Sequence, residues 1–204
     1  MKYNRNQDSS FWKLARSFLH EYMPIVRNLS DKTVESYKIS IKLYLTFIND
    51  EKNITNDKIT FDIFTRANMK DYIVWLKNKN ASAKTINLRM TALKSFLKYC
   101  SEEDFELRVF YNNACTIKGQ KIIKKPIEYL KPEATKAILS AFVGDTVKHR
   151  RNRMILILMY DSGCRVQEIA DLKVSSLHLD VRNPYMTVIG KGRKTRNVPL
   201  TRKT

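Results

Sequence analysis

Apolar side chains recur every three or four residues through the first hundred positions, which is the spacing of amphipathic helices. The pattern predicts four of them. The first follows Ser10 and ends at Pro24, because proline interrupts a helix. The others follow Ser30, Asn68 and Ser82, three residue types that favour the position before a helix. Four helices of this size can close one small core.

The periodicity fades after residue 101, and the chain becomes polar up to the basic run KGQKIIKKP. We therefore predict a linker over 105–125, between a helical domain at 9–104 and a second domain at 126–204. In the second domain, Pro132 opens a helix. Asp145 is expected to cap another helix, KHRRNRMILILMYD, whose basic first part lies at the surface and whose apolar second part lies in the core.

The end of the chain predicts a β-hairpin. The runs PYMTVIG (184–190) and RNVPL (196–200) are rich in strand-forming residues, and KGRKT between them supplies a glycine-containing turn. An alternative for the preceding segment, VQEIADLKVSSL, is the opening of a helix-turn-helix. Pro184 and the β-branched residues after Ser176 make a poor second helix, so we rank this alternative lower.

Charge identifies the class of partner. The 204 residues hold 38 Lys and Arg against 20 Asp and Glu, a net charge of +18. The first 104 residues have a net charge of +6 and the last 100 have +12. This excess of positive charge indicates a polyanion as partner, bound mainly by the second half of the chain. The three cysteines lack metal-binding spacing, so we expect reduced thiols and no zinc site. The longest apolar run, 154–160, is too short for a membrane span, and no secretion signal opens the chain, which predicts a cytoplasmic protein.

Two groups of residues have candidate chemistry. In SGCRVQEIADL (162–172), Arg165 and Glu168 are three residues apart and share one helix face. The carboxylate can therefore fix the position of the guanidinium, which can then bind a phosphate. The alternative is a plain exposed ion pair. In IGKGRKTRNVPL (189–200), Lys191 lies in a tight turn, and three more cations follow it on a hairpin that can seek phosphate or simply be solvated: Arg193, Lys194 and Arg196.

The two groups together, S-G-x-R-x-x-E-I-x-x-L, a strand, G-K-G-x-K-x-R and V-P-L, resemble the tyrosine recombinase (phage integrase) family. By motif the resemblance covers residues 126–204, and by layout it covers the whole chain. It implies a mainly α fold, with a SAM-like four-helix core-binding domain and part of an α+β catalytic domain that has a small β-hairpin sheet. It also implies that residues 105–125 are a basic linker between the two.

The resemblance assigns roles to residues. In the family, arginines and a lysine stabilise the scissile phosphate while a tyrosine attacks it, with no metal or nucleotide cofactor. Arg165 would be the first catalytic arginine, Glu168 its acidic neighbour and Lys191 the general acid. The family's H-x-x-R motif and the tyrosine nucleophile lie beyond the hairpin, and this sequence of 204 residues contains neither there. We therefore expect this chain alone not to cleave DNA.

The resemblance also implies duplex DNA as partner, in site-specific recombination or integration of a mobile element, by a synaptic tetramer. By family geometry, polar residues of the fourth helix would reach the major groove, although a plain polar face is an equal alternative: Lys84, Thr85, Asn87 and Arg89. Basic residues elsewhere would follow the phosphates: Lys121, Lys124, Lys125, Lys148, Arg150, Arg151, Arg193, Lys194 and Arg196. The rival interpretations are a non-catalytic DNA-binding regulator or remnant that occupies recombination sites, and general nucleic-acid binding without a defined site.

Overall fold

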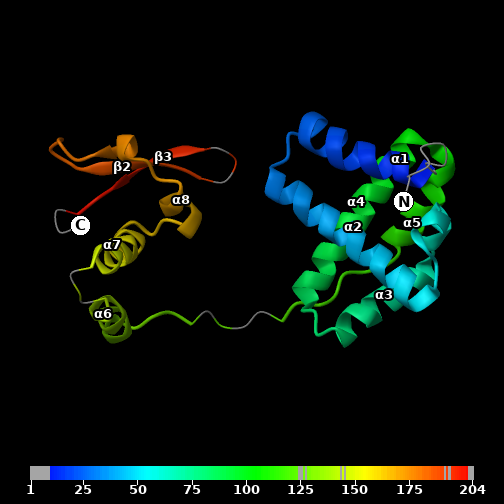
Figure 1. Cartoon of the computed structure of the whole chain (residues 1–204), viewed down its shortest axis with the longest axis horizontal. Coiled ribbons are helices and arrows are strands. Elements are labelled where there is room, and N and C mark those ends of the chain that lie inside the picture. Colours follow the sequence, from blue (N-terminus) through cyan, green and yellow to red (C-terminus); the bar gives the residue numbers. More distant parts are fainter. Residues whose placement is uncertain are drawn as a thin grey trace. The chain divides into compact units, whose positions relative to one another are not determined.

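The computed structural model describes residues 10–123, 126, 128–142, 144, 146–190, 192 and 194–201. The chain forms two compact units, residues 1–125 and 126–204 (Figure 1). Each unit is described below by itself.

In the described part of unit 1, every regular element is a helix. Its elements are α1 (Ser10–Ser17), η1 (Phe18–Val26), α2 (Asp31–Lys52), η2 (Asn56–Lys58), η3 (Phe61–Ile63), α3 (Arg66–Asn78), α4 (Ala83–Glu103), η4 (Phe105–Leu107) and α5 (Arg108–Cys115). Side-chain oxygens cap two of the α-helices of unit 1: Thr65 accepts from the backbone N–H of Asn68, and Ser82 from that of Thr85. The helix expected after Asn68 thus begins earlier, at Arg66, because Thr65 is its cap.

The first helix does not end at Pro24 as predicted. It widens into the π-helix η1, which includes Pro24 and ends at Val26. The Arg27 N–H donates to the Tyr22 carbonyl at 2.8 Å, a bond that spans five residues. Because the wider turn changes the hydrogen-bonding pattern around it, the chain accommodates a proline that has no N–H to donate.

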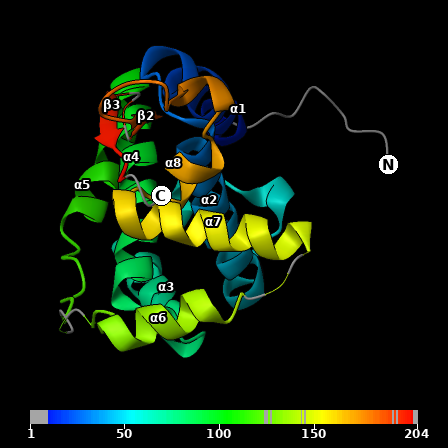
Figure 2. The same ribbon diagram turned by 90° about the vertical axis from the view of Figure 1, so that its left-hand side faces the viewer.

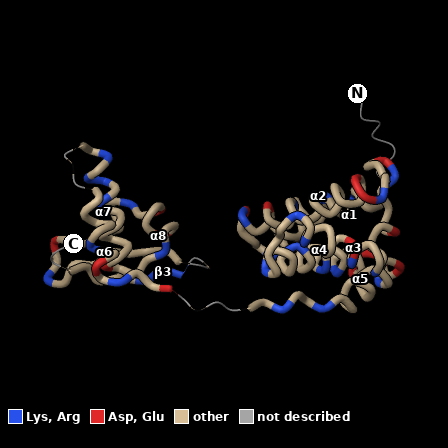
Figure 3. Tube along the Cα trace, turned by 90° about the horizontal axis from the view of Figure 1, so that it is seen from below, with Lys and Arg blue, Asp and Glu red and all other residues tan. Residues whose placement is uncertain are grey.

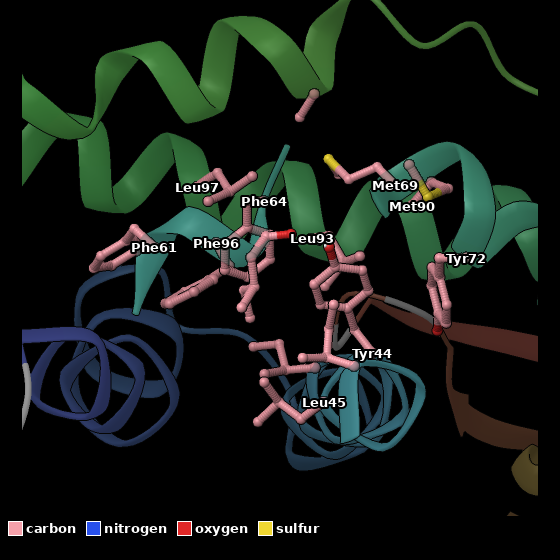
Figure 4. Packing of buried hydrophobic residues seen from close by; sticks show 14 of the residues in the cluster. Tyr44, Leu45, Phe61, Phe64, Met69, Tyr72, Met90, Leu93, Phe96 and Leu97 are labelled. Atoms are coloured by element: carbon pink, nitrogen blue, oxygen red, sulfur yellow. Dashed lines mark hydrogen bonds between the residues drawn. The ribbon is translucent and has the colours of Figure 1, made fainter. Parts of the chain in front are cut away.

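The core of unit 1 is rich in aromatic rings. Phe11 and Phe96 are fully buried, with ring centroids 5.7 Å apart in an edge-to-face arrangement. Phe64 packs into the same cluster (Figure 4), and the buried Tyr44 hydroxyl donates to the Ile63 carbonyl at 2.7 Å. Phe64 and Ile63 come from the short segment between α2 and α3, whose core residues the helical spacing did not predict.

The predicted linker over 105–125 is wrong in its first part. Residues 105–115 form η4 and α5, and Leu107, Ala114 and Ile117 are buried in the core of unit 1. The spacing of these three residues is itself helical, with Phe110 between them packed against the core. Charged and amide side chains are interspersed among these apolar residues, so the stretch resembles a linker in composition.

Unit 2 combines short helices with a small sheet. Its elements are α6 (Pro132–Ser140), α7 (Val147–Ser162), α8 (Val166–Ala170), η5 (Val174–Ser176), β1 (Leu177–His178), β2 (Tyr185–Ile189) and β3 (Thr195–Pro199). Pro132 occupies the first turn of α6, as expected. The Thr146 hydroxyl caps α7 by accepting from the His149 N–H, whereas the expected cap, Asp145, lies outside the described residues.

The three strands form an antiparallel sheet in the order β1, β2, β3. Met186 pairs with Val198, and both are buried on the face that packs against Ile169 of α8. This confirms the predicted hairpin and the mainly helical fold with a small sheet. The helix-turn-helix alternative is wrong, because α8 is followed by η5 and strand β1 instead of a second helix.

Helices α6 and α7 lie side by side, with α7 between α6 and the rest of unit 2 (Figure 1 and Figure 2). In the described structure neither helix has a buried residue. The apolar second part of α7 reaches the core only at its edge: Leu158 and Met159 pack against the core cluster of unit 2 but are partly buried, and Tyr160 is 69% exposed. No helix of the described chain is both long and apolar enough to cross a membrane.

Candidate functional site

The site is built at the start of α8. Gly163 ends α7 in the left-handed conformation, with φ +59°, and its N–H donates to the Met159 carbonyl. Arg165 follows in extended conformation as the N-cap of α8. The Glu168 carboxylate, in the first turn, turns back and accepts the Arg165 backbone N–H at 2.9 Å through Oε2. The two predicted residues are therefore brought together by a helix start.

The Arg165 side chain is exposed but tethered. Its Nη1 donates to Glu168 Oε1 at 2.9 Å, and the side chain as a whole is 71% exposed. Nη1 therefore has the carboxylate as partner while most of the guanidinium faces solvent. This geometry presents a fixed cation with a planar fork of donors, which suits an incoming phosphate.

Arg196 also binds Glu168. From β3, its Nη1 donates to Oε1 at 3.0 Å and its Nη2 to Oε2 at 2.8 Å. Its Nη2 also lies 3.7 Å from the sulfur of the buried Cys164. Sequence reasoning grouped Arg196 with the phosphate-seeking cations and missed this pair. The sequence signal that could have indicated it is the spacing in the strand: Arg196 and the core residue Val198 are two residues apart, so their side chains share one face of the sheet.

The Glu168 carboxylate is charged, although its side chain is only 4% exposed. The hydrogen bonds from Arg196 and from the Arg165 backbone hold the pKa of Glu168 at about 2, below its ordinary value of 4.5, against the opposing effect of desolvation. The same pair raises the pKa of Arg196. Glu168 therefore remains an anion at any physiological pH.

Gly190 leaves room for this pair at the base of the hairpin. A Cβ at this position would lie 3.1 Å from Arg196 Nη1 and 3.2 Å from Glu168 Oε1. The Gly190 N–H donates to the Lys194 carbonyl at 2.8 Å, which closes the turn. Lys191, the expected general acid, and Arg193 lie outside the described residues.

On α4, the structure separates the four predicted groove residues. Lys84 is exposed, while the Thr85 hydroxyl pairs with that of the cap residue Ser82 at 2.9 Å. The Asn87 side chain binds the backbone of Gln120. Arg89 reaches α2, where its Nη1 donates to the Ser40 hydroxyl at 3.0 Å. The last two side chains are thus engaged in holding unit 1 together.

The remaining predicted basic residues lie at the surface where they are described. Lys and Arg recur along the extended segment after α5 and in the first part of α7 (Figure 3). The exposed members of the predicted set are Lys121, Lys148, Arg150, Arg151 and Lys194. Lys124 and Lys125 lie outside the described residues. Within the described structure, no three His, Cys, Asp or Glu residues are placed to hold a metal ion.

Comparison with protein families matches both units. Residues 17–104 match the phage integrase N-terminal SAM-like domain, and residues 128–204 match the phage integrase family. Among curated relatives, the tyrosine recombinase XerC of Chlamydia muridarum is 28% identical over 195 residues, covering 89% of this chain and 60% of the relative. The tyrosine recombinase XerD of Oceanobacillus iheyensis is 31% identical over 184 residues, covering 90% and 58%. The chain thus spans about three fifths of the length of these relatives.

Solved structures share the fold. The XerH site-specific recombinase, in a post-cleavage complex with its difH substrate, has a TM-score of 0.63 at 19% identity, over 86% of this chain and 50% of that one. The Tn1549 transposon integrase, in complex with transposon right end DNA, has a TM-score of 0.61 at 18% identity, over 93% and 61%. With both domains matched in order and the Arg165–Glu168 motif formed as a site, this chain belongs to the tyrosine recombinase (phage integrase) family.

Proposed function

We propose that these residues bind duplex DNA and supply part of the strand-transfer site of a site-specific tyrosine recombinase. Unit 1 would act as the core-binding domain and unit 2 as the first part of the catalytic domain. The observation that carries the proposal is the state of Arg165, an exposed guanidinium held at a helix start by a buried carboxylate.

The chemistry follows from that state. A guanidinium that stays charged, with donors that face solvent, can bind the non-bridging oxygens of a phosphodiester. It then stabilises the additional negative charge that develops on those oxygens when a nucleophile attacks phosphorus. Because the tether to Glu168 is already formed, little reorganisation is needed at the moment of reaction. Lys191, next in sequence to Gly190, is our candidate for the general acid toward the leaving oxygen.

Exposed cations outside the site would supply most of the affinity. Lys121, Lys148, Arg150 and Arg151 are each exposed, and Lys84 is the exposed member of the set on α4. Contacts of this kind release counterions, so the affinity should fall steeply with salt. The 204 residues contain no His-x-x-Arg and no tyrosine after the hairpin, so we expect binding without a covalent adduct from these residues alone.

The test is binding of a fluorescent random-sequence duplex, followed by anisotropy between about 50 and 200 mM salt. Arg165→Gln should weaken binding about tenfold or more, because charge-assisted hydrogen bonds to phosphate are lost. Arg182→Gln removes an exposed cation of the same unit and serves as the matched control. Equal affinities for the two variants would refute the role of Arg165.

Two further measurements address the reaction and the assembly. A denaturing gel of the mixture with duplex DNA should show no protein–DNA adduct, and an adduct would refute the expectation that cleavage needs further residues. Sedimentation with and without DNA tests whether a tetramer assembles on two duplexes. A monomer in both conditions would contradict assembly by these residues.

A further inference from the structure

The two arginines that bind Glu168 use it differently. Arg196 gives both terminal nitrogens to the carboxylate, while Arg165 gives one. Building on the function proposed above, we propose that Arg196 is a positioning residue: it fixes Glu168 and thereby keeps Arg165 turned toward the phosphate, instead of contacting DNA itself.

The carboxylate of Glu168 is fully occupied. Oε1 accepts from Arg165 Nη1 and Arg196 Nη1, and Oε2 accepts from the Arg165 backbone N–H and Arg196 Nη2. A carboxylate offers about four acceptor positions, so these four bonds fill it. No position is left for a second bond from the Arg165 guanidinium.

This occupancy has a consequence for Arg165. A lone Arg beside a carboxylate prefers two parallel bonds, which would turn its fork inward. Arg196 holds the two positions that such a pairing needs, so Arg165 keeps one bond and remains 71% exposed, against 42% for the Arg196 side chain. Without Arg196, we expect Arg165 to close onto Glu168 and to present fewer donors to DNA.

The sheet directs Arg196 toward Glu168. Arg196 is two residues from the buried Val198, on the core face of β3, and Gly190 leaves the space in which the pair forms. Glu168 needs this partner, because a carboxylate with 4% exposure is costly when it is left partly unpaired. Both observations distinguish Arg196 from Lys194, the exposed cation described on the same hairpin.

A double-substitution cycle tests the proposal, with anisotropy on the random-sequence duplex across the same salt range. Arg165→Gln should lower the affinity about tenfold and reduce the salt slope by about 0.9, the value of one phosphate contact. Arg196→Gln should reproduce most of both effects. The double variant should bind no more weakly than Arg165→Gln, because Arg196 acts through Arg165.

Two results would each contradict a different claim. If Arg196→Gln weakens binding further in the Arg165→Gln background and lowers the salt slope again, Arg196 contacts a phosphate and the positioning role is overturned. If Arg165→Gln binds like Arg182→Gln, the proposed function fails instead.

Arg196→Lys covers the case in which the glutamine variant unfolds. Lysine keeps the positive charge but cannot form the bidentate pair of hydrogen bonds with the Glu168 carboxylate. A positioning role predicts a loss of affinity close to that of Arg165→Gln, whereas a phosphate contact predicts affinity near wild type. Circular dichroism confirms that each variant compared is folded. Binding by Arg196→Lys within twofold of wild type would overturn the proposal.

Discussion

Asn87 holds both backbone groups of Gln120: its Oδ1 accepts the Gln120 N–H at 2.6 Å, and its Nδ2 donates to the Gln120 carbonyl at 2.9 Å. The pair ties α4 to the chain as it leaves α5. Replacing Asn87 with alanine should lower the free energy of unfolding by about 1 to 2 kcal/mol, because two hydrogen bonds are lost in a partly buried place. Urea unfolding measures this change. Asn78→Ala, at an exposed position, is the control, and an equal effect of both substitutions would contradict the stabilising role of the two Asn87–Gln120 hydrogen bonds.

The contribution of the Glu168 carboxylate to the free energy of unfolding should depend on pH. Its pKa is about 2 in the folded chain against an ordinary 4.5, so the folded state binds its proton less readily than the unfolded state does. The stabilisation of the folded state by the ionised Glu168 is therefore present in full above pH 4.5 and is lost as the pH falls toward 2. Glu168→Gln should therefore be less stable than wild type at neutral pH, and the difference should shrink over that interval. Denaturant midpoints from circular dichroism give the comparison, and a difference independent of pH would contradict it.

The two units should unfold separately, with unit 2 first. In the described structure, 27 buried residues make up the core cluster of unit 1, but five make up that of unit 2. Trp12 and Trp75 both lie in unit 1, so tryptophan fluorescence reports on that unit, while circular dichroism reports on both. The circular dichroism change should begin at lower urea than the fluorescence change. Coincident curves would show one cooperative transition instead.

Thiol chemistry should distinguish the three cysteines. Cys115 is exposed at the end of α5, whereas Cys100 and Cys164 are buried. Burial also raises the pKa of the Cys100 thiol and so disfavours its reactive thiolate. We expect one thiol to react rapidly with a colorimetric disulfide reagent in the native protein and all three after denaturation. Cys115→Ser should abolish the rapid phase, and its persistence would contradict the assignment.

Local signals predicted much of the fold. Ser82 precedes α4 and Pro132 opens α6, because capping and proline geometry act within a few residues. The strand-forming residues of 184–190 and 196–200 and the glycine-containing turn between them predicted the hairpin for the same reason. Phe61 and Phe64 were missed as core residues because they lie in short turns without a repeating period.

The site was predictable in part. Arg165 and Glu168 are three residues apart, so one helix start explains their meeting. Arg196 joins them from a distant strand: its spacing of two from Val198 indicates which face of β3 it lies on, but only the tertiary fold brings that face to Glu168. For Asn87 and Arg89, the sequence showed a polar helix face, while their partners lie on other segments of unit 1.

The separation of 28 residues between Glu168 and Arg196 also sets an order of events during synthesis. A ribosome adds about 5 to 20 residues per second, so roughly one to six seconds pass after Glu168 is made before Arg196 exists. Until then the nascent chain holds Arg165 and Glu168 alone, free to close on each other. Under the positioning role proposed for Arg196, the hairpin must be translated, folded and docked before Arg165 is turned outward, so the site forms late in the synthesis of these residues and not when α8 is made.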